Sequence, residues 1–328
     1  MARSSPRGRG WGTLVALVLA ALTFWVSGDP TALIGFPLAA VLLALPPRRP
    51  AQLVLAALGL LLALAGPLDS AIGQFDRVWA LLLGVWFVAS LYFVRGISLT
   101  SRSLLATLAT AASSAVFLLF RPGGIAGLDS ELSATLKTAV KQQIELWNAA
   151  GAKLPPAFTQ GMYRVVEIRS AVAPALAALA SMAALALVWG IYQRTARRDE
   201  TAAAPGAPVA PVAPLPPLRE FRFRDELVWL LIAGVLLVLV PGLAPGAVRA
   251  GANLLTFMGA LYALRGVAVL VSMSGGAFGL GGLLLVLFAA LADSWIPALV
   301  MAAAVLVGLT DTWLDLRARI AAPSGNGK

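Results

Sequence analysis

The sequence predicts an all-α protein, a polytopic transmembrane helical bundle of eight to ten spans, and three observations carry this prediction. First, 59% of the 328 residues are hydrophobic and only 12% are charged, whereas soluble domains carry about 25% charged residues. Second, apolar runs of the length that membrane helices need recur along the chain. Third, the net charge of +10 comes largely from basic residues between these runs, as is typical of membrane loops.

The residue types that are absent exclude several classes of chemistry. The chain contains no histidine and no cysteine, so we expect no His/Cys metal site, no haem ligation by these side chains and no Ser-His-Asp or Cys-His catalytic group. The phosphate-binding pattern Gly-x-x-x-x-Gly-Lys-Ser/Thr is also missing. We therefore expect a protein that is not an enzyme, with no cofactor and no metal. Its scattered positive charge also argues against binding to nucleic acid.

About ten apolar runs are expected to cross the membrane. The first follows a basic segment and has the shape of a secretory signal peptide, but the second comes too soon after it for a clear cleavage site. We therefore expect the first run to be retained as a span. The expected spans are 11–26, 30–45, 51–65, 78–94, 103–120, 170–192, 227–240, 251–272, 280–291 and 297–316.

A stretch rich in alanine and proline, at 201–218, divides the chain. Such a segment cannot bury a core and is expected to be disordered or polyproline-like. The division predicts an N-terminal six-span bundle at 1–192, a cytoplasmic linker at 193–218, a C-terminal four-span bundle at 219–319 and a tail at 320–328. Bases and aromatics alternate just after the linker, at 219–224, which predicts an anchor at anionic headgroups.

The outer loop at 121–169 is expected to contain an amphipathic helix. Asp129 is in position to cap this helix, which would end at Gly151. The helix would lie on the outer leaflet as a connector, or cover a substrate cavity as a lid. Its apolar residues recur every three or four positions: Leu132, Leu136, Val140, Ile144 and Trp147.

The distribution of lysine and arginine predicts the orientation. With the N-terminus in the cytoplasm, most basic residues fall on the cytoplasmic side, and the short outer loops hold only Arg77 and Arg249. An even number of spans would bring the C-terminus to the same side. The expected location is therefore a bacterial cytoplasmic (inner) membrane, with the lipid bilayer as the first partner.

Charges inside the last apolar runs mark the candidate site. Arg265 and Asp311 are expected at similar depth, and Tyr262 and Asn253 lie one and three turns outward from Arg265 on roughly the same side of its helix. Three alternatives stay open: both charges reach the aqueous interface, they form a structural ion pair, or they contact a solute or ion. Asp311 and Asp315 share a helix face, but a metal site is not expected there.

The C-terminal third resembles the YybS-like family of uncharacterised bacterial membrane proteins, a domain of unknown function. The resemblance rests on residues 221–229 before a span, on 253–269 and on 308–317, and it covers 218–319. The family often has glutamine where this chain has Arg265.

That family is distantly similar to the substrate-binding (S) components of energy-coupling-factor transporters and to the rod-shape protein MreD. An S component binds a small vitamin or metal and docks on a membrane partner through small residues of its first helix, a role that Ala16 and Ala20 would fit. The resemblance therefore implies a component that binds a small solute or is associated with transport and works with an ATPase module. The alternative is a membrane scaffold of cell-envelope assembly, with partners from the cell-wall machinery.

Overall fold

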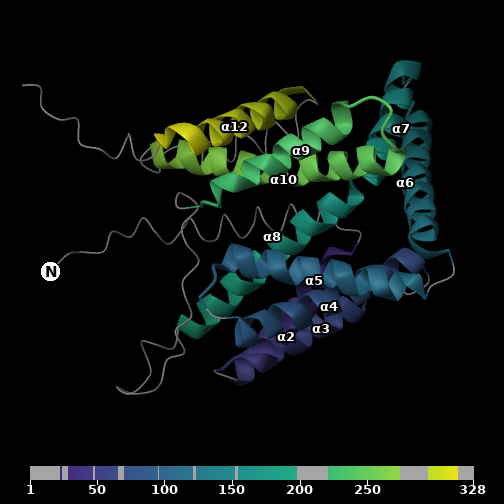
Figure 1. The fold of residues 1–328 in the computed structure, drawn as a ribbon. Helices are drawn as coiled ribbons and strands as arrows, with labels where there is room; N and C mark the ends of the chain where they lie inside the picture. The colour runs from purple at the N-terminus through teal and green to yellow at the C-terminus, as the bar shows by residue number, and fades with distance from the viewer. Residues whose placement is uncertain are drawn as a thin grey trace, which may run out of the picture. The chain divides into compact units, whose positions relative to one another are not determined.

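The computed structural model is all-helical over the residues that it describes, with no strand among them, which confirms the predicted fold class (Figure 1). These residues form two compact units, divided at residue 215. The described residues are Thr23 and 29–46, 49–65, 70–94, 96–120, 123–151, 154–197, 221–273 and 295–316.

The helices of the N-terminal unit are α2 (Pro30–Ala44), α3 (Pro50–Leu64), α4 (Ala71–Phe93), α5 (Leu99–Leu119), α6 (Gly124–Ala149), α7 (Pro156–Ala171) and α8 (Ala173–Arg197). Those of the C-terminal unit are a 3-10 turn, η3 (Asp225–Leu227), then α9 (Val228–Leu239), α10 (Pro245–Met273) and α12 (Trp295–Leu314). Each expected span between 30 and 120 and between 170 and 272 therefore corresponds to a helix, as does the last one.

Four of the described helices are long and apolar enough to cross a membrane: Ile72–Phe93, Leu99–Leu119, Ala173–Ala196 and Pro245–Met273. The apolar helices α2, α3 and the Met301–Leu314 part of α12 are shorter. The expected spans at 11–26 and 280–291, the linker at 201–218 and the tail at 320–328 lie outside the described residues.

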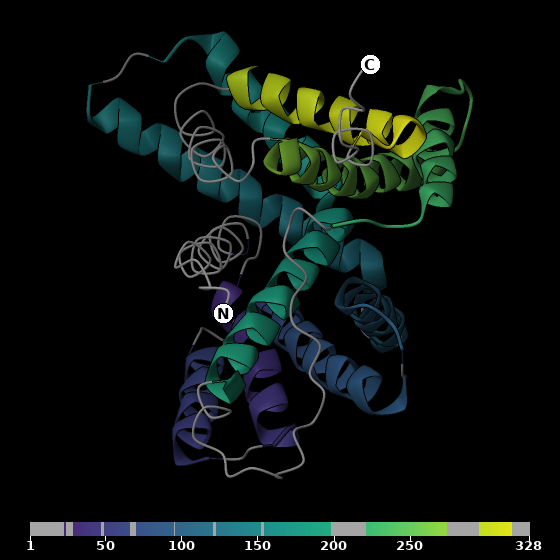
Figure 2. The same ribbon diagram turned by 90° about the vertical axis from the view of Figure 1, so that its left-hand side faces the viewer.

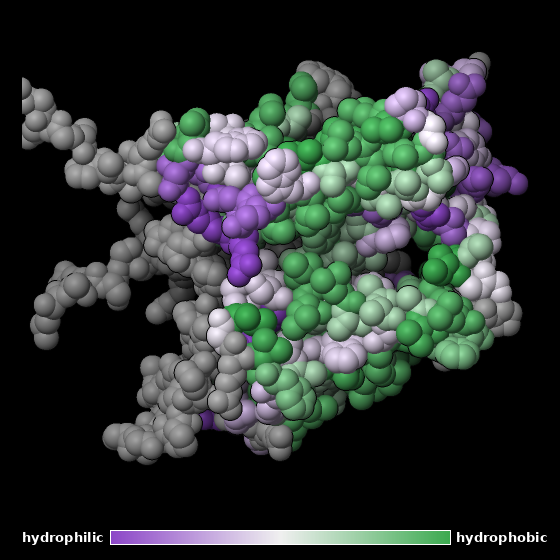
Figure 3. Space-filling model, in the orientation of Figure 1, coloured by the Kyte–Doolittle hydropathy of each residue, from purple (hydrophilic) through white to green (hydrophobic). Residues whose placement is uncertain are grey.

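Apolar side chains also cover much of the outside of both units, as expected where lipid is the solvent. Exposed examples are Leu108 on α5 and Trp229, Leu236 and Leu239 on α9. Hydrophilic side chains gather instead over α6 and α7 (Figure 3).

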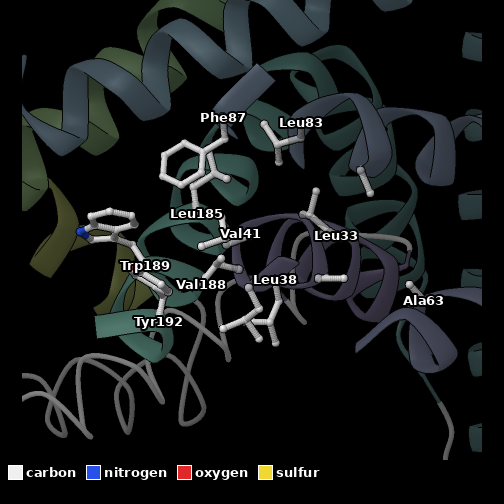
Figure 4. Close-up of a cluster of buried hydrophobic side chains, with 14 of the residues drawn as sticks. Leu33, Leu38, Val41, Ala63, Leu83, Phe87, Leu185, Val188, Trp189 and Tyr192 are labelled. Atoms are coloured by element: carbon white, nitrogen blue, oxygen red, sulfur yellow. The ribbon is translucent and has the colours of Figure 1, made fainter. Parts of the chain in front are cut away.

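The core of the N-terminal unit lies between α2, α4 and α8 (Figure 4). Val41, Leu83, Leu185 and Val188 are fully buried there. Phe87 of α4 packs edge-on against Trp189 of α8, with ring centres 6.1 Å apart. Figure 2 shows α8 running diagonally past α2 and α5, both of which it contacts. This apolar centre gives α8 a fixed place among the helices of its unit.

Two helices begin earlier than the apolar runs indicated. Ser70 caps α4 by accepting a hydrogen bond from the Gly73 amide at 3.0 Å, so the helix starts seven residues before the expected span. Arg77, expected in an outer loop, consequently lies in α4, where it is buried and donates a hydrogen bond to the Leu64 carbonyl. Pro245 similarly starts α10 before the expected 251, which places Arg249 inside that helix.

The segment 121–169, expected to be an outer loop, contains a pair of helices, whereas the sequence indicated one. Asp129 does not cap the first of them: the chain turns at Gly123, whose φ of +82° suits glycine, and α6 begins at once at Gly124. The expected apolar face of α6 is half-buried, and α6 packs on α7. Ser133 and Ser170 hydroxyls lie 2.8 Å apart across this contact. The amphipathic helix is therefore present, and it has a neighbour that the apolar pattern did not indicate.

A hydrogen bond between α4 and α8 offers a first test of the packing. Trp79 donates its indole N–H to the Ser181 hydroxyl at 2.9 Å. Trp79→Phe removes the donor and should lower the free energy of unfolding by about 1 kcal/mol. Ser181→Ala should cost a similar amount, and the double variant little more. Chemical unfolding in mild detergent measures all three; fully additive losses would show that the bond contributes nothing.

Candidate functional site

Arg265 of α10 is the most deeply buried charge among the basic residues described in the C-terminal unit. Its side chain is only 1% exposed. Its Nε donates to a carboxylate oxygen of Asp311 at 3.0 Å, and a terminal nitrogen donates to the Asp311 backbone carbonyl at 3.3 Å. The Asp311 side chain is itself fully buried. Of the three alternatives left open by the sequence, the structure shows the ion pair; neither side chain reaches the aqueous interface.

A second carboxylate reaches Arg265 from the segment before α9. Asp225 accepts a hydrogen bond from the other terminal nitrogen at 2.7 Å, although its own side chain is 60% exposed. Phe223 covers the guanidinium, whose central carbon lies 5.4 Å from the ring centre. The same ring packs edge-on against Tyr262, with centres 5.0 Å apart. One arginine thus holds together α10, α12 and the segment that leads into α9.

The basic and aromatic stretch after the linker also makes contacts within the C-terminal unit. Phe221 and Phe223 pack against the core of the C-terminal unit, beside Val228 and Tyr262. The guanidinium of Arg222 pairs with Asp315 near the end of α12. These side chains thus have partners within the protein, and contact of the stretch with lipid headgroups remains a prediction.

Two glycines explain why the Arg265–Asp311 pair forms. Gly266 follows Arg265 on α10, and Gly308 lies one turn before Asp311 on α12. A Cβ at Gly266 would overlap the Ala304 carbonyl oxygen, and one at Gly308 would overlap the Tyr262 carbonyl oxygen. The two backbones therefore touch, which only glycine permits. This contact brings both charges within hydrogen-bonding distance.

The residues expected to form a binding site are only partly brought together. Tyr262, Arg265 and Asp311 lie in one buried cluster. Asn253 is twelve residues before Arg265 on the same helix, about 18 Å away at 1.5 Å per residue, and its amide donates to the Arg249 carbonyl. The structure thus separates Asn253 from the other three. Ala16 and Ala20, expected to dock a partner, lie outside the described residues.

The carboxylates of this cluster bind arginine side chains, and they are too few to form a metal site. No group of three or more acidic side chains that could hold a metal occurs in the described part of the chain. Asp311 pairs with Arg265, while Asp315, one turn later, pairs with Arg222. Each carboxylate of this helix end is therefore already matched by an arginine.

A polar hollow lies along α7, where no helix was expected. Its described lining includes Gln160, Tyr163, Arg164 and Glu167, with Ile168 and Ala171 at its apolar side. The residues recur every three or four positions and so form one stripe of the helix. This periodicity is present in the sequence and is the signal that could have indicated α7.

The two carboxylates around Arg265 should differ in their importance. Asp225→Ala is expected to lower the free energy of unfolding by about 1 kcal/mol, because water can replace an exposed carboxylate. Asp311→Ala should cost about 3–5 kcal/mol, because it leaves a buried guanidinium without its buried carboxylate partner. Unfolding in mild detergent measures both, with the exposed neighbour Glu226→Ala as the control. Equal losses for the two aspartates would contradict this ranking.

The fold and the buried ion pair define a polytopic α-helical membrane protein. The chain belongs to the family described as "Predicted membrane protein (DUF2232)", whose model matches residues 13–312. The match reaches well beyond the C-terminal third that carried the resemblance. No curated protein and no solved structure matches the chain significantly.

Proposed function

We propose that this protein is a non-enzymatic scaffold of a bacterial cytoplasmic membrane, which holds a protein partner during cell-envelope assembly. Both ends of the chain would lie in the cytoplasm, as the placement of lysine and arginine suggests. The absence of histidine and cysteine from the sequence supports a role without catalysis. Within this proposal, the C-terminal unit is a fixed module, and its buried charges serve the fold.

This proposal rests on the contacts that the Arg265 guanidinium makes within the protein. Its guanidinium is 1% exposed and bonded to Asp311 and Asp225, and Phe223 lies over it. A solute would have to displace a buried carboxylate to reach it, which is costly in a medium of low dielectric constant. The backbone contact at Gly308 also leaves no room between α10 and α12 at this point. These contacts favour the scaffold over a solute-binding bundle.

A small-solute-binding, transport-associated role is the second candidate, and the hollow along α7 favours it. One stripe of this helix carries hydrogen-bond donors and acceptors together with a positive and a negative side chain: Gln160, Tyr163, Arg164 and Glu167. A polar solute would then bind at the outer loop instead of at Arg265. This role resembles that of an S component and would require an ATPase module as the partner.

Affinity purification from native membranes in mild detergent tests both candidates. Proteins and small molecules that stay with the full chain are identified by mass spectrometry. The scaffold is expected to retain proteins of cell-wall synthesis and no metabolite. As the matched variant, Gln160→Ala with Arg164→Ala alters the hollow without touching the Arg265 cluster, and it should leave the retained proteins unchanged.

Two outcomes would overturn the scaffold proposal. One is an ATPase module that accompanies the chain in place of wall-synthesis proteins. The other is a metabolite that the wild type retains and the Gln160→Ala, Arg164→Ala variant loses. Either result would establish the transport-associated role instead.

A further inference from the structure

Helix α7 carries a partly exposed apolar stripe, one member of which, Phe158, also contacts Trp147 of α6 with ring centres 5.7 Å apart. Phe158 is 48% exposed, Val165 62% and Ile168 56%. At about 100° per residue, these three side chains lie within one third of the circumference of the helix. Val166 and Ser170, on a different side, are buried. The stripe is therefore distinct from the buried side of α7, and it borders the polar hollow at Ile168.

Both ends of the outer loop are tied to helices that suit the membrane. Only Val172 separates α7 from α8, which is long and apolar enough to span a bilayer. At the other end, four residues, 120–123, separate α6 from α5, which is another such helix. The α6–α7 pair is consequently held next to the bilayer surface. An apolar stripe in this position has lipid within reach.

The charges of α7 are arranged as they are on helices that rest on a lipid surface. Arg164 lies at one edge of the stripe and Arg169 at the other. Glu167 projects from the opposite side of the helix, among the residues of the polar hollow. Arginines at the edges can extend to phosphates while their stems cover apolar surface, and an acidic residue there would be repelled.

From these three observations, we propose that α7 is an interfacial helix. Phe158, Val165 and Ile168 enter the acyl boundary of the outer leaflet, and Arg164 and Arg169 contact anionic headgroups. The lipid contact thus belongs to the helix that the apolar pattern did not indicate. The apolar face of α6, which the sequence led us to expect either on the leaflet or over a cavity, is half-buried. This proposal does not depend on the proposed scaffold role.

The absence of cysteine from the chain makes a direct test practical. Single replacements Phe158→Cys, Val165→Cys and Ile168→Cys place a bimane probe on the stripe. Gln160→Cys and Glu167→Cys place the same probe on the opposite side of the helix and serve as matched controls. The full chain is reconstituted into vesicles of phosphatidylcholine and phosphatidylglycerol, some of which carry doxyl groups near the headgroup.

The three stripe probes are expected to lose at least half of their fluorescence to doxyl lipids, and the two control probes much less. Soluble iodide should give the reverse order. Arg164→Gln combined with Arg169→Gln should reduce the doxyl quenching at Val165→Cys, and more so in vesicles that contain phosphatidylglycerol. Circular dichroism of each variant shows that the helices remain intact.

Three results would overturn the proposal. Equal doxyl quenching on both sides of α7 would mean that the stripe has no special relation to lipid. Stripe probes reached by iodide and not by doxyl groups would place the stripe in water. Stripe probes protected from both quenchers would show that protein covers it, either another part of this chain or a second copy.

Discussion

Arg265→Ala is expected to lower the free energy of unfolding by about 3–5 kcal/mol, one of the two largest losses predicted for this protein. The reason is the charge left behind. Asp311 is fully buried beside Arg265, and without the guanidinium its carboxylate would have to stay charged in an apolar medium or take up a proton. Chemical unfolding of the full chain in mild detergent measures the loss.

The pairing also predicts how two substitutions combine. Once Arg265 is alanine, Asp311→Ala should add little, because the second change removes the unpaired carboxylate. Arg265→Met with Asp311→Leu, which fills the space without charge, should be more stable than either single alanine variant. Arg224→Ala, at an exposed position of the same unit, should change little and serves as the control. Additive losses at Arg265 and Asp311 would refute the pair.

Gly308→Ala is expected to have an effect of similar size for a different reason. The added methyl group would overlap the Tyr262 carbonyl oxygen and approach the Gly266 amide at 2.8 Å. A backbone cannot rotate away as a side chain can, so α10 and α12 must separate. The expected loss is about 3 kcal/mol, at the upper end of the usual cost of overpacking. It includes weaker contact between Arg265 and Asp311.

A glycine on the same helix pair provides the matched control for this substitution. A Cβ at Gly259 of α10 would meet nothing within 4 Å. Gly259→Ala should therefore be neutral or add about 0.5–1 kcal/mol, because alanine favours the helix over glycine. Unfolding of both variants is followed in the same detergent. A Gly308→Ala protein as stable as Gly259→Ala would contradict the backbone contact.

The helices and the central charge pair could be predicted because both follow from the cost of placing polar groups in lipid. An apolar run such as the one at 103–120 must form a helix to bond its own backbone, and α5 does so. The same cost applies to a lone charge, so Arg265 and Asp311 were expected to need partners. The energetic cost of a lone charge left three alternatives open. The distance between Arg265 and Asp311 and the burial of both side chains identify the ion pair.

The remaining features depend on contacts that no local pattern encodes. Asp225 precedes α9 along the chain, and nothing nearby in the sequence indicates that it reaches Arg265, forty positions later. Nothing in the sequence distinguishes Gly266 and Gly308 from the many other glycines of the chain. Their role is seen only in the structure, where the backbones of two helices meet at these positions. Helix α7 was missed for another reason: charged residues such as Arg164 and Glu167 interrupt its hydropathy, so the segment is not an apolar run.

The most direct test of the scaffold role is to purify the charge-free variant, Arg265→Met with Asp311→Leu, beside the wild type from native membranes. Its folding is first verified by chemical unfolding in mild detergent. If the ion pair serves only the fold, the folded variant should retain the same proteins of cell-wall synthesis as the wild type, and neither protein should retain a metabolite. A folded variant that has lost a metabolite present in the wild type would show that Arg265 and Asp311 bind a solute, and the scaffold role would be wrong.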